Sequence, residues 1–100
     1  MSVKSNLTNN NTEIVINIDG RFDFTAANDF RNCYRNHPVV PIYTLDMSKV
    51  EFMDSAAIGM LLLLNEYVAG KGKIKIIRSN EIVKKIITSA HIDRFIEIAA

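Results

Sequence analysis

Residues 52–64 read FMDSAAIGMLLLL and place an acid and a hydroxyl between a strand and an apolar helix. Before them, residues 42–47 (IYTLDM) have the composition of a short buried strand. After the Asp-Ser pair, the apolar run continues to residue 64, where polar residues return. We therefore expect a helix from Ser55 to about residue 69, with Ser55 at its N-terminus.

A serine in this position has two uses. As an N-cap, the Ser55 hydroxyl would accept a hydrogen bond from a free backbone N–H of the first turn, and Asp54 would shape the turn that presents it. The aligned peptide dipoles also favour negative charge at a helix N-terminus, so the fold would tolerate a phosphate on Ser55. Position alone favours the cap.

The rest of the chain alternates strands and helices. Strands at residues 3–7 and 14–18 flank a turn and form a hairpin that Asp19-Gly20 ends. A helix capped by Thr25 is expected over residues 26–36, a strand near 74–77, a helix capped by Ser79 or Asn80, and a last strand over 95–98. This order predicts an α/β fold with a mixed, partly parallel sheet and helices packed on it.

Three segments carry a family resemblance: residues 18–23 (IDGRFD), residues 44–50 (TLDMSKV) and the Asp54-Ser55 pair. With them the chain resembles a STAS domain, the module shared by anti-sigma factor antagonists and the cytoplasmic tails of sulfate transporters. The likeness runs over roughly the whole chain and implies one STAS domain at residues 1–100. The chain departs from many antagonists at Ala56-Ala57, where they carry a small polar residue and then glycine.

The resemblance implies a partner-switching function in signal transduction and transcription regulation. Ser55 would be phosphorylated by a serine kinase that is also an anti-sigma factor or its relative, and restored by a PP2C-type phosphatase. The unphosphorylated chain would hold the kinase, and phosphorylation would release it. The alternative is a stand-alone STAS subunit that supports the ATPase of an ABC-type lipid transporter, where charge at position 55 would be dispensable.

The expected partner surface combines the turn after residue 20 with the start of the helix at Ser55. The run 56–64 is apolar on more sides than a sheet-facing stripe needs. We expect Ile58, Leu61 and Leu62 in the core and Ala57, Met60 and Leu64 nearer the other face. The candidate partner-binding residues are Arg21, Phe22, Asp23, Asp54, Ala56, Ala57, Ile58 and Met60.

Composition limits other functions. Twelve basic and eleven acidic residues give a net charge of +1, which argues against nucleic-acid binding. Cys33 is the single cysteine, so no internal disulfide forms and a reducing compartment is expected. No secretion signal is visible, and the apolar run is far shorter than the roughly 20 residues that span a bilayer. We expect a soluble, cytoplasmic, bacterial protein without membrane insertion.

Enzymatic motifs are not visible in the sequence. It contains neither the Gly-x-Ser-x-Gly elbow of serine hydrolases nor a phosphate-binding Gly-x-x-x-x-Gly-Lys loop, so we expect no enzyme and no cofactor. Asp46 and Asp54 could be considered as a metal-binding pair. Asp46 is instead expected to cap the loop that leads to Val50.

Overall fold

Five strands form a single mixed sheet in this computed structural model, which describes residues 2–8, 10 and 12–99. The sheet order follows the chain order, with an antiparallel first pair and parallel pairs thereafter. The strands are β1 (Ser2–Thr8), β2 (Glu13–Phe22), β3 (Ile42–Met53), β4 (Lys73–Ile77) and β5 (Glu97–Ile98). This arrangement confirms the predicted α/β class and mixed sheet.

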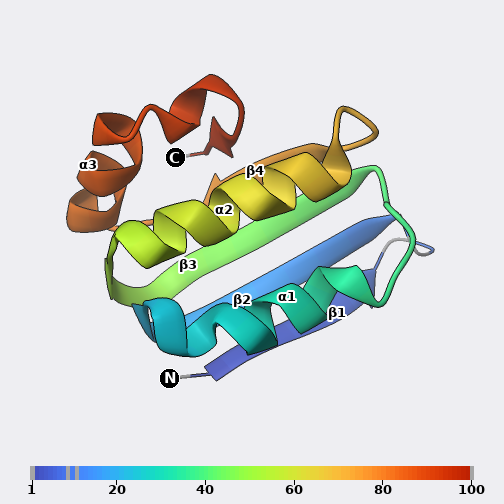
Figure 1. Ribbon diagram of the computed structural model, residues 1–100, viewed down its shortest axis with the longest axis horizontal. Coiled ribbons are helices and arrows are strands. Elements are labelled where there is room, and N and C mark those ends of the chain that lie inside the picture. Colours follow the sequence, from blue (N-terminus) through green and yellow to red (C-terminus); the bar gives the residue numbers. More distant parts are fainter. Residues whose placement is uncertain (1, 9, 11, 100) are drawn as a thin grey trace.

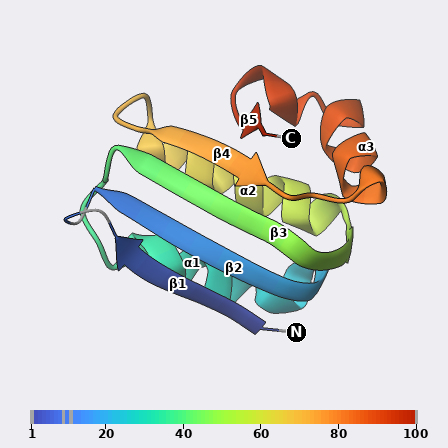
Figure 2. The same ribbon diagram turned by 180° about the vertical axis from the view of Figure 1, so that it is seen from behind.

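Helices cover one face of the sheet. α1 (Ala27–Arg35) and α2 (Ser55–Val68) lie side by side on that face, and Figure 1 shows α3 (Glu81–Ser89) near the start of α2. Seen from behind, the opposite face of the sheet carries no helix (Figure 2). The ends of β2 and β3, the start of α2 and α3 therefore meet in one corner of the molecule.

The core lies between the sheet and the covering helices. Alternate residues of β2, namely Ile14, Ile16 and Ile18, are almost completely buried, as period-two alternation predicts. Phe30 of α1 packs on Phe22 with ring centroids 5.2 Å apart. Each such fully buried side chain contributes about 1.5–3 kcal/mol of stabilisation.

Strands β2 and β3 run further than the sequence suggested. β2 continues past Gly20 to Phe22, and β3 continues past Asp46 to Met53. The pairing register shifts twice, between Asn17 and Asp19 and after Gly20, and each shift accommodates an extra residue on β3. Each bulge of this kind leaves one residue of β3 unpaired and bends the strand locally. β3 ends at Met53, directly before Asp54.

Two predicted element ends need correction, and one open alternative is resolved. Thr25 does not cap α1: a 3₁₀ turn at Phe24–Ala26 precedes that helix, and the Asp23 carboxylate accepts the Thr25 N–H at 3.0 Å. The last strand is shorter than predicted because a second 3₁₀ turn, Ile92–Arg94, leads into it. Of the two candidates for the α3 cap, Asn80 holds the position, accepting the Val83 N–H at 2.8 Å.

The faces of α2 also differ from the expectation. Ala57, Met60, Leu61 and Leu64 are buried, whereas Leu62 is largely exposed. The prediction was right for Leu61 and in part for Ile58, which is half-buried against the core. It was wrong for the other four, because a continuous apolar run offers no polar residues to mark the outer side. Within the described ranges, no helix combines the length and the apolar character needed to cross a membrane.

Candidate functional site

Asp54 joins the end of β3 to the start of α2 and is held by three hydrogen bonds. Its N–H donates to the Phe22 carbonyl oxygen at the end of β2 (3.3 Å). Its carboxylate accepts the Ala57 N–H (3.1 Å), and its carbonyl accepts the Ile58 N–H (3.2 Å). Asp54 is therefore the N-cap of α2, with extended backbone angles.

Ser55 is the first helical residue of α2, one position after the cap. The predicted start of the helix at Ser55 is confirmed. The alternative in which the Ser55 hydroxyl caps the helix is wrong, because Asp54 performs that role. The Ser55 side chain is exposed, and its hydroxyl has no hydrogen-bond partner among the described residues. In the first turn, the N–H groups of Ser55 and Ala56 have no acceptor within the helix.

An apolar groove of about 710 Å³ lies beside Ser55, between the β3–α2 junction and α3. We call it the Ser55 groove. The first side comes from the chain on either side of Asp54, and the second from α3, whose Ile82 is 58% exposed. Its lining residues are Phe52, Met53, Asp54, Ser55, Ile58, Ile82, Lys85, Ile86, Ser89 and Ala90.

The start of α3 is fastened to β3, which fixes the second side of the Ser55 groove. The Asn80 side-chain amide donates to the Val50 carbonyl oxygen at 3.1 Å, while its oxygen caps the helix. Arg78, just before this cap, forms an ion pair with Asp46 of β3. These contacts join segments about thirty residues apart in the sequence.

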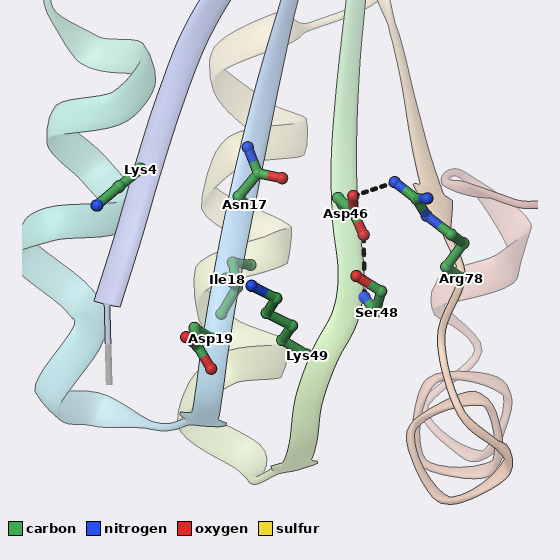
Figure 3. A pocket seen from close by; sticks show the side chains of 8 residues that line it. All are labelled: Lys4, Asn17, Ile18, Asp19, Asp46, Ser48, Lys49 and Arg78. Atoms are coloured by element: carbon green, nitrogen blue, oxygen red, sulfur yellow. Dashed lines mark hydrogen bonds and ion pairs between the residues drawn. The ribbon is translucent and has the colours of Figure 1, made fainter.

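Asp46 does not lie in the Ser55 groove. It points onto the face of the sheet that carries no helix, into a polar hollow of about 400 Å³ (Figure 3). Burial alone would raise the pKa of Asp46, but hydrogen bonds from Ser48 and Arg78 outweigh it and hold the pKa below its ordinary value. The expected loop cap is thus a residue within β3, although its carboxylate does accept the Ser48 N–H at 3.0 Å.

The end of β2 lies next to the Ser55 groove because it pairs with the end of β3. Arg21 is opposite Phe52 in the register, and its guanidinium carbon lies 4.9 Å from the centre of that ring. Arg21 Nε also lies 3.9 Å from Asp23 Oδ2. The hydrogen bond from the Thr25 hydroxyl is the main reason that the pKa of Asp23 is lowered.

The expected partner-binding residues divide into two groups. Arg21, Asp23, Asp54, Ala56 and Ile58 are exposed or partly exposed at this corner, as is Ser55. Phe22, Ala57 and Met60 are buried, the first two completely, because they belong to the core between the sheet and the helices, where Phe22 packs on Phe30. A partner cannot reach these three side chains, so they are removed from the candidate surface.

Sequence reasoning missed Phe52 and the whole α3 side of the groove. On α3, Ile82 is 58% exposed and directly precedes Val83, which fills the core position. The available signal was the pair of adjacent apolar residues Ile82 and Val83, because both cannot face the core from the start of one amphipathic helix. The predicted faces of a helix cannot reveal which neighbouring segment stands across from Ser55. In the part of the chain that the structure describes, no three potential ligands gather to hold a metal ion.

One mixed sheet carries two helices on one face, and a serine opens α2 at the corner, which defines a small α/β domain. The STAS domain model matches residues 4–100, and the chain belongs to the STAS domain family. A STAS-domain containing protein of Pseudomonas aeruginosa is 35% identical over 89 residues, which cover 87% of this chain and 88% of that protein.

Solved structures agree with this membership. The chain is similar to the unphosphorylated form of the Bacillus anti-sigma factor antagonist SpoIIAA, with TM-score 0.78, 18% identity and coverage of 99% and 89% of the two chains. For an anti-sigma factor antagonist from Mycobacterium paratuberculosis, the TM-score is 0.77 and the identity 15%, with coverage of 97% of this chain and 85% of that chain. For a sulfate transporter family protein from Wolinella succinogenes, the TM-score is 0.70 and the identity 17%, with coverage of 80% of this chain and 67% of that chain. At these identities the likeness concerns the fold.

Proposed function

We propose that this chain is a phosphorylation-controlled binding protein of the anti-sigma factor antagonist type. Unphosphorylated, it binds a serine kinase that is also an anti-sigma factor or a relative, which frees a sigma factor or another client. Phosphorylation of Ser55 releases that partner, and a PP2C-type serine phosphatase restores binding. The observation that carries the proposal is the exposed Ser55 hydroxyl in the wall of an apolar groove.

The helix terminus supports a phosphate at this position. The N–H groups of Ser55 and Ala56 are not used by the helix, and Asp54 already satisfies the Ala57 N–H. Oriented N–H groups and the helix dipole stabilise negative charge there. Phosphorylation can therefore occur without unfolding α2.

Charge supports the release step. A phosphate adds about 1.5 to 2 negative charges beside the Asp54 carboxylate. A partner packed into the Ser55 groove would have to desolvate this charge or place its own carboxylates against it. A hundredfold loss of affinity requires only about 2.7 kcal/mol, which an unpaired charge at an interface can supply.

The rigidity of the corner supports control through surface charge rather than through shape. Asp54 is tied to β2 and to the first turn of α2, and Asn80 ties α3 to β3. Both sides of the Ser55 groove are thus fixed to the same sheet. A local change of charge is then enough for two-state control of binding.

A pull-down from the native cell lysate, read by mass spectrometry, tests the proposal with four baits: wild type, Ser55→Ala, Ser55→Glu and Asn32→Glu. Asn32→Glu adds the same charge on the exposed side of α1, away from the groove, and serves as the matched control. We expect a kinase or anti-sigma-like protein on every bait except Ser55→Glu. Equal capture of a transporter ATPase by all four would support the scaffold alternative and reject the phosphoswitch.

A further inference from the structure

A second surface lies where α1 and the second half of α2 run side by side on the covered face of the sheet (Figure 1). We call it the α1/α2 seam. It encloses a hollow of about 400 Å³ and shares no lining residue with the Ser55 groove. Its lining residues are Arg31, Tyr34, Arg35, Leu63, Glu66 and Tyr67.

The floor of the α1/α2 seam is aromatic and fixed. The ring centroids of Tyr34 and Tyr67 are 5.1 Å apart. The Tyr67 hydroxyl donates a hydrogen bond to the His37 carbonyl oxygen at 2.6 Å. Leu63 stands beside them with 55% of its surface exposed. Tyrosine and arginine around an exposed apolar side chain are the composition that protein interfaces concentrate at their centres.

The charges of the α1/α2 seam are asymmetric. Arg31 and Arg35 lie one helical turn apart on α1, and neither forms an ion pair within the described residues. Both arginines line the same hollow as Tyr34. Burial raises the pKa of Tyr34, and the positive charges of Arg31 and Arg35 partly oppose the rise. Across the seam, Glu66 of α2 is likewise without an ion pair in the described part of the chain.

We propose that the α1/α2 seam is a second docking surface, which takes an acidic amphipathic helix of a partner protein. Carboxylates one turn apart on that helix match the spacing of Arg31 and Arg35, and arginine binds carboxylates through two parallel hydrogen bonds. An apolar side chain of the helix packs against Leu63 over the two tyrosines. Glu66 repels the acidic side of the helix and so sets its orientation.

This surface acts independently of phosphorylation. The Ser55 groove lies at the first turn of α2 and at α3, whereas the seam lies along α1 and the second half of α2. One chain can therefore hold an acidic helix at the seam while the state of Ser55 controls the other partner. Binding at the seam can therefore be present or absent whether or not phosphorylation of Ser55 controls the other surface.

The test is an NMR titration of the full ¹⁵N-labelled chain with two synthetic helical peptides of about 18 residues, or five turns. Both carry leucine at every third or fourth position, and the remaining positions are mainly glutamate in one peptide and lysine in the other. We expect the acidic peptide to shift the amides of residues 31–35 and 60–67, and the basic peptide to leave them unchanged.

Reversing the charge of the two seam arginines distinguishes specific docking from non-specific electrostatic binding. In Arg31→Glu/Arg35→Glu, we expect affinity for the acidic peptide to fall by about tenfold or more and the basic peptide to bind instead. Lys4→Glu/Lys49→Glu makes the same change of net charge on the opposite face of the sheet and should bind like the wild type. Leu63→Ser, at an exposed position, should weaken binding while the chain stays folded.

Three results of the wild-type titration would overturn the inference. They are the absence of shifts with the acidic peptide, equal shifts with both peptides, and shifts confined to residues of the Ser55 groove. Equal loss of binding in the seam variant and the Lys4/Lys49 control would also reject it, because that would reflect net charge alone.

Discussion

The carboxylate of Asp54 accepts a hydrogen bond from the Ala57 amide at 3.1 Å, so the residue before Ser55 caps α2. This relationship separates two tasks that a serine at a helix start often combines. Asp54 holds the helix, and Ser55 remains available at the surface.

The first prediction follows from this division of tasks. Asp54→Ala should lower the free energy of unfolding by about 1 kcal/mol, because it removes the cap. Ser55→Ala should change it by less than about 0.5 kcal/mol, as expected of an exposed substitution. Urea denaturation of both variants and the wild type measures the difference. A larger loss in Ser55→Ala would mean that the serine hydroxyl, and not the carboxylate, caps α2.

The second prediction concerns Asp46 and pH. Its pKa in the folded chain lies below its ordinary value of 3.8, so its charged form stabilises the fold above that pH. This contribution is lost as the pH falls through the lowered value. Asp46→Asn should cost about 1 kcal/mol at pH 7, because it removes the ion pair between the buried Asp46 carboxylate and the largely exposed Arg78 guanidinium.

The measurement is denaturation of the wild type and Asp46→Asn between pH 7 and pH 3. The difference in stability should shrink as the pH falls below 3.8, because the unfolded wild type then binds a proton at this carboxyl that the folded chain binds only at lower pH. Carboxyls present in both proteins cancel from the comparison. A difference that stays constant over this range would show that the Asp46 charge does not contribute.

The third prediction compares two glycines. A Cβ on Gly72 would clash with the carbonyl oxygen of Val40 and lie 3.0 Å from that of Pro41, so Gly72→Ala should destabilise by about 1–3 kcal/mol. A Cβ on Gly59, inside α2, would meet no atom within 4 Å. Gly59→Ala should therefore stabilise by about 0.5–1 kcal/mol. Thermal unfolding of both variants checks the opposite signs, and a shared sign would refute the comparison.

The fourth prediction rests on the proposed use of the Ser55 groove. Ile82→Ala should weaken capture of the partner by about tenfold, because truncating an apolar contact at an interface typically costs more than 1 kcal/mol. Stability should hardly change, since Ile82 is mostly exposed. Leu7→Ala, an exposed apolar residue of β1, is the control. Binding assays with the partner identified by pull-down should separate the two variants, and equal affinities would contradict the assignment.

The order of strands and helices could be predicted because each element carries its own period of apolar residues. The Asp54-Ser55 corner was likewise visible, since an acid and a serine interrupt two apolar segments. The inner face of α2 was not visible, because residues 60–64 are all apolar and burial there depends on the sheet beneath. The extension of β3 to Met53 depends on bulged pairing with β2, which no local pattern in residues 48–52 announces.

The α3 side of the groove depends on contacts between distant parts of the chain. Asn80 meets Val50, and Arg78 meets Asp46, only after β3 and β4 have paired. Phe22, Ala57 and Met60 were misplaced for the same reason: their exposure is decided by packing, while their sequence neighbours lie at the surface.

The Ser55 groove is built from two separate stretches of chain, and this has a consequence for divergence among related proteins. The β3–α2 stretch presents the hydroxyl, whereas α3 supplies Ile82, Lys85 and Ile86. Under the proposed function, substitutions on α3 can alter which kinase fits the groove while Ser55 and the residues around it stay the same. Duplicated copies in one cell could in this way come under separate kinases, with cross-talk limited by a single short helix.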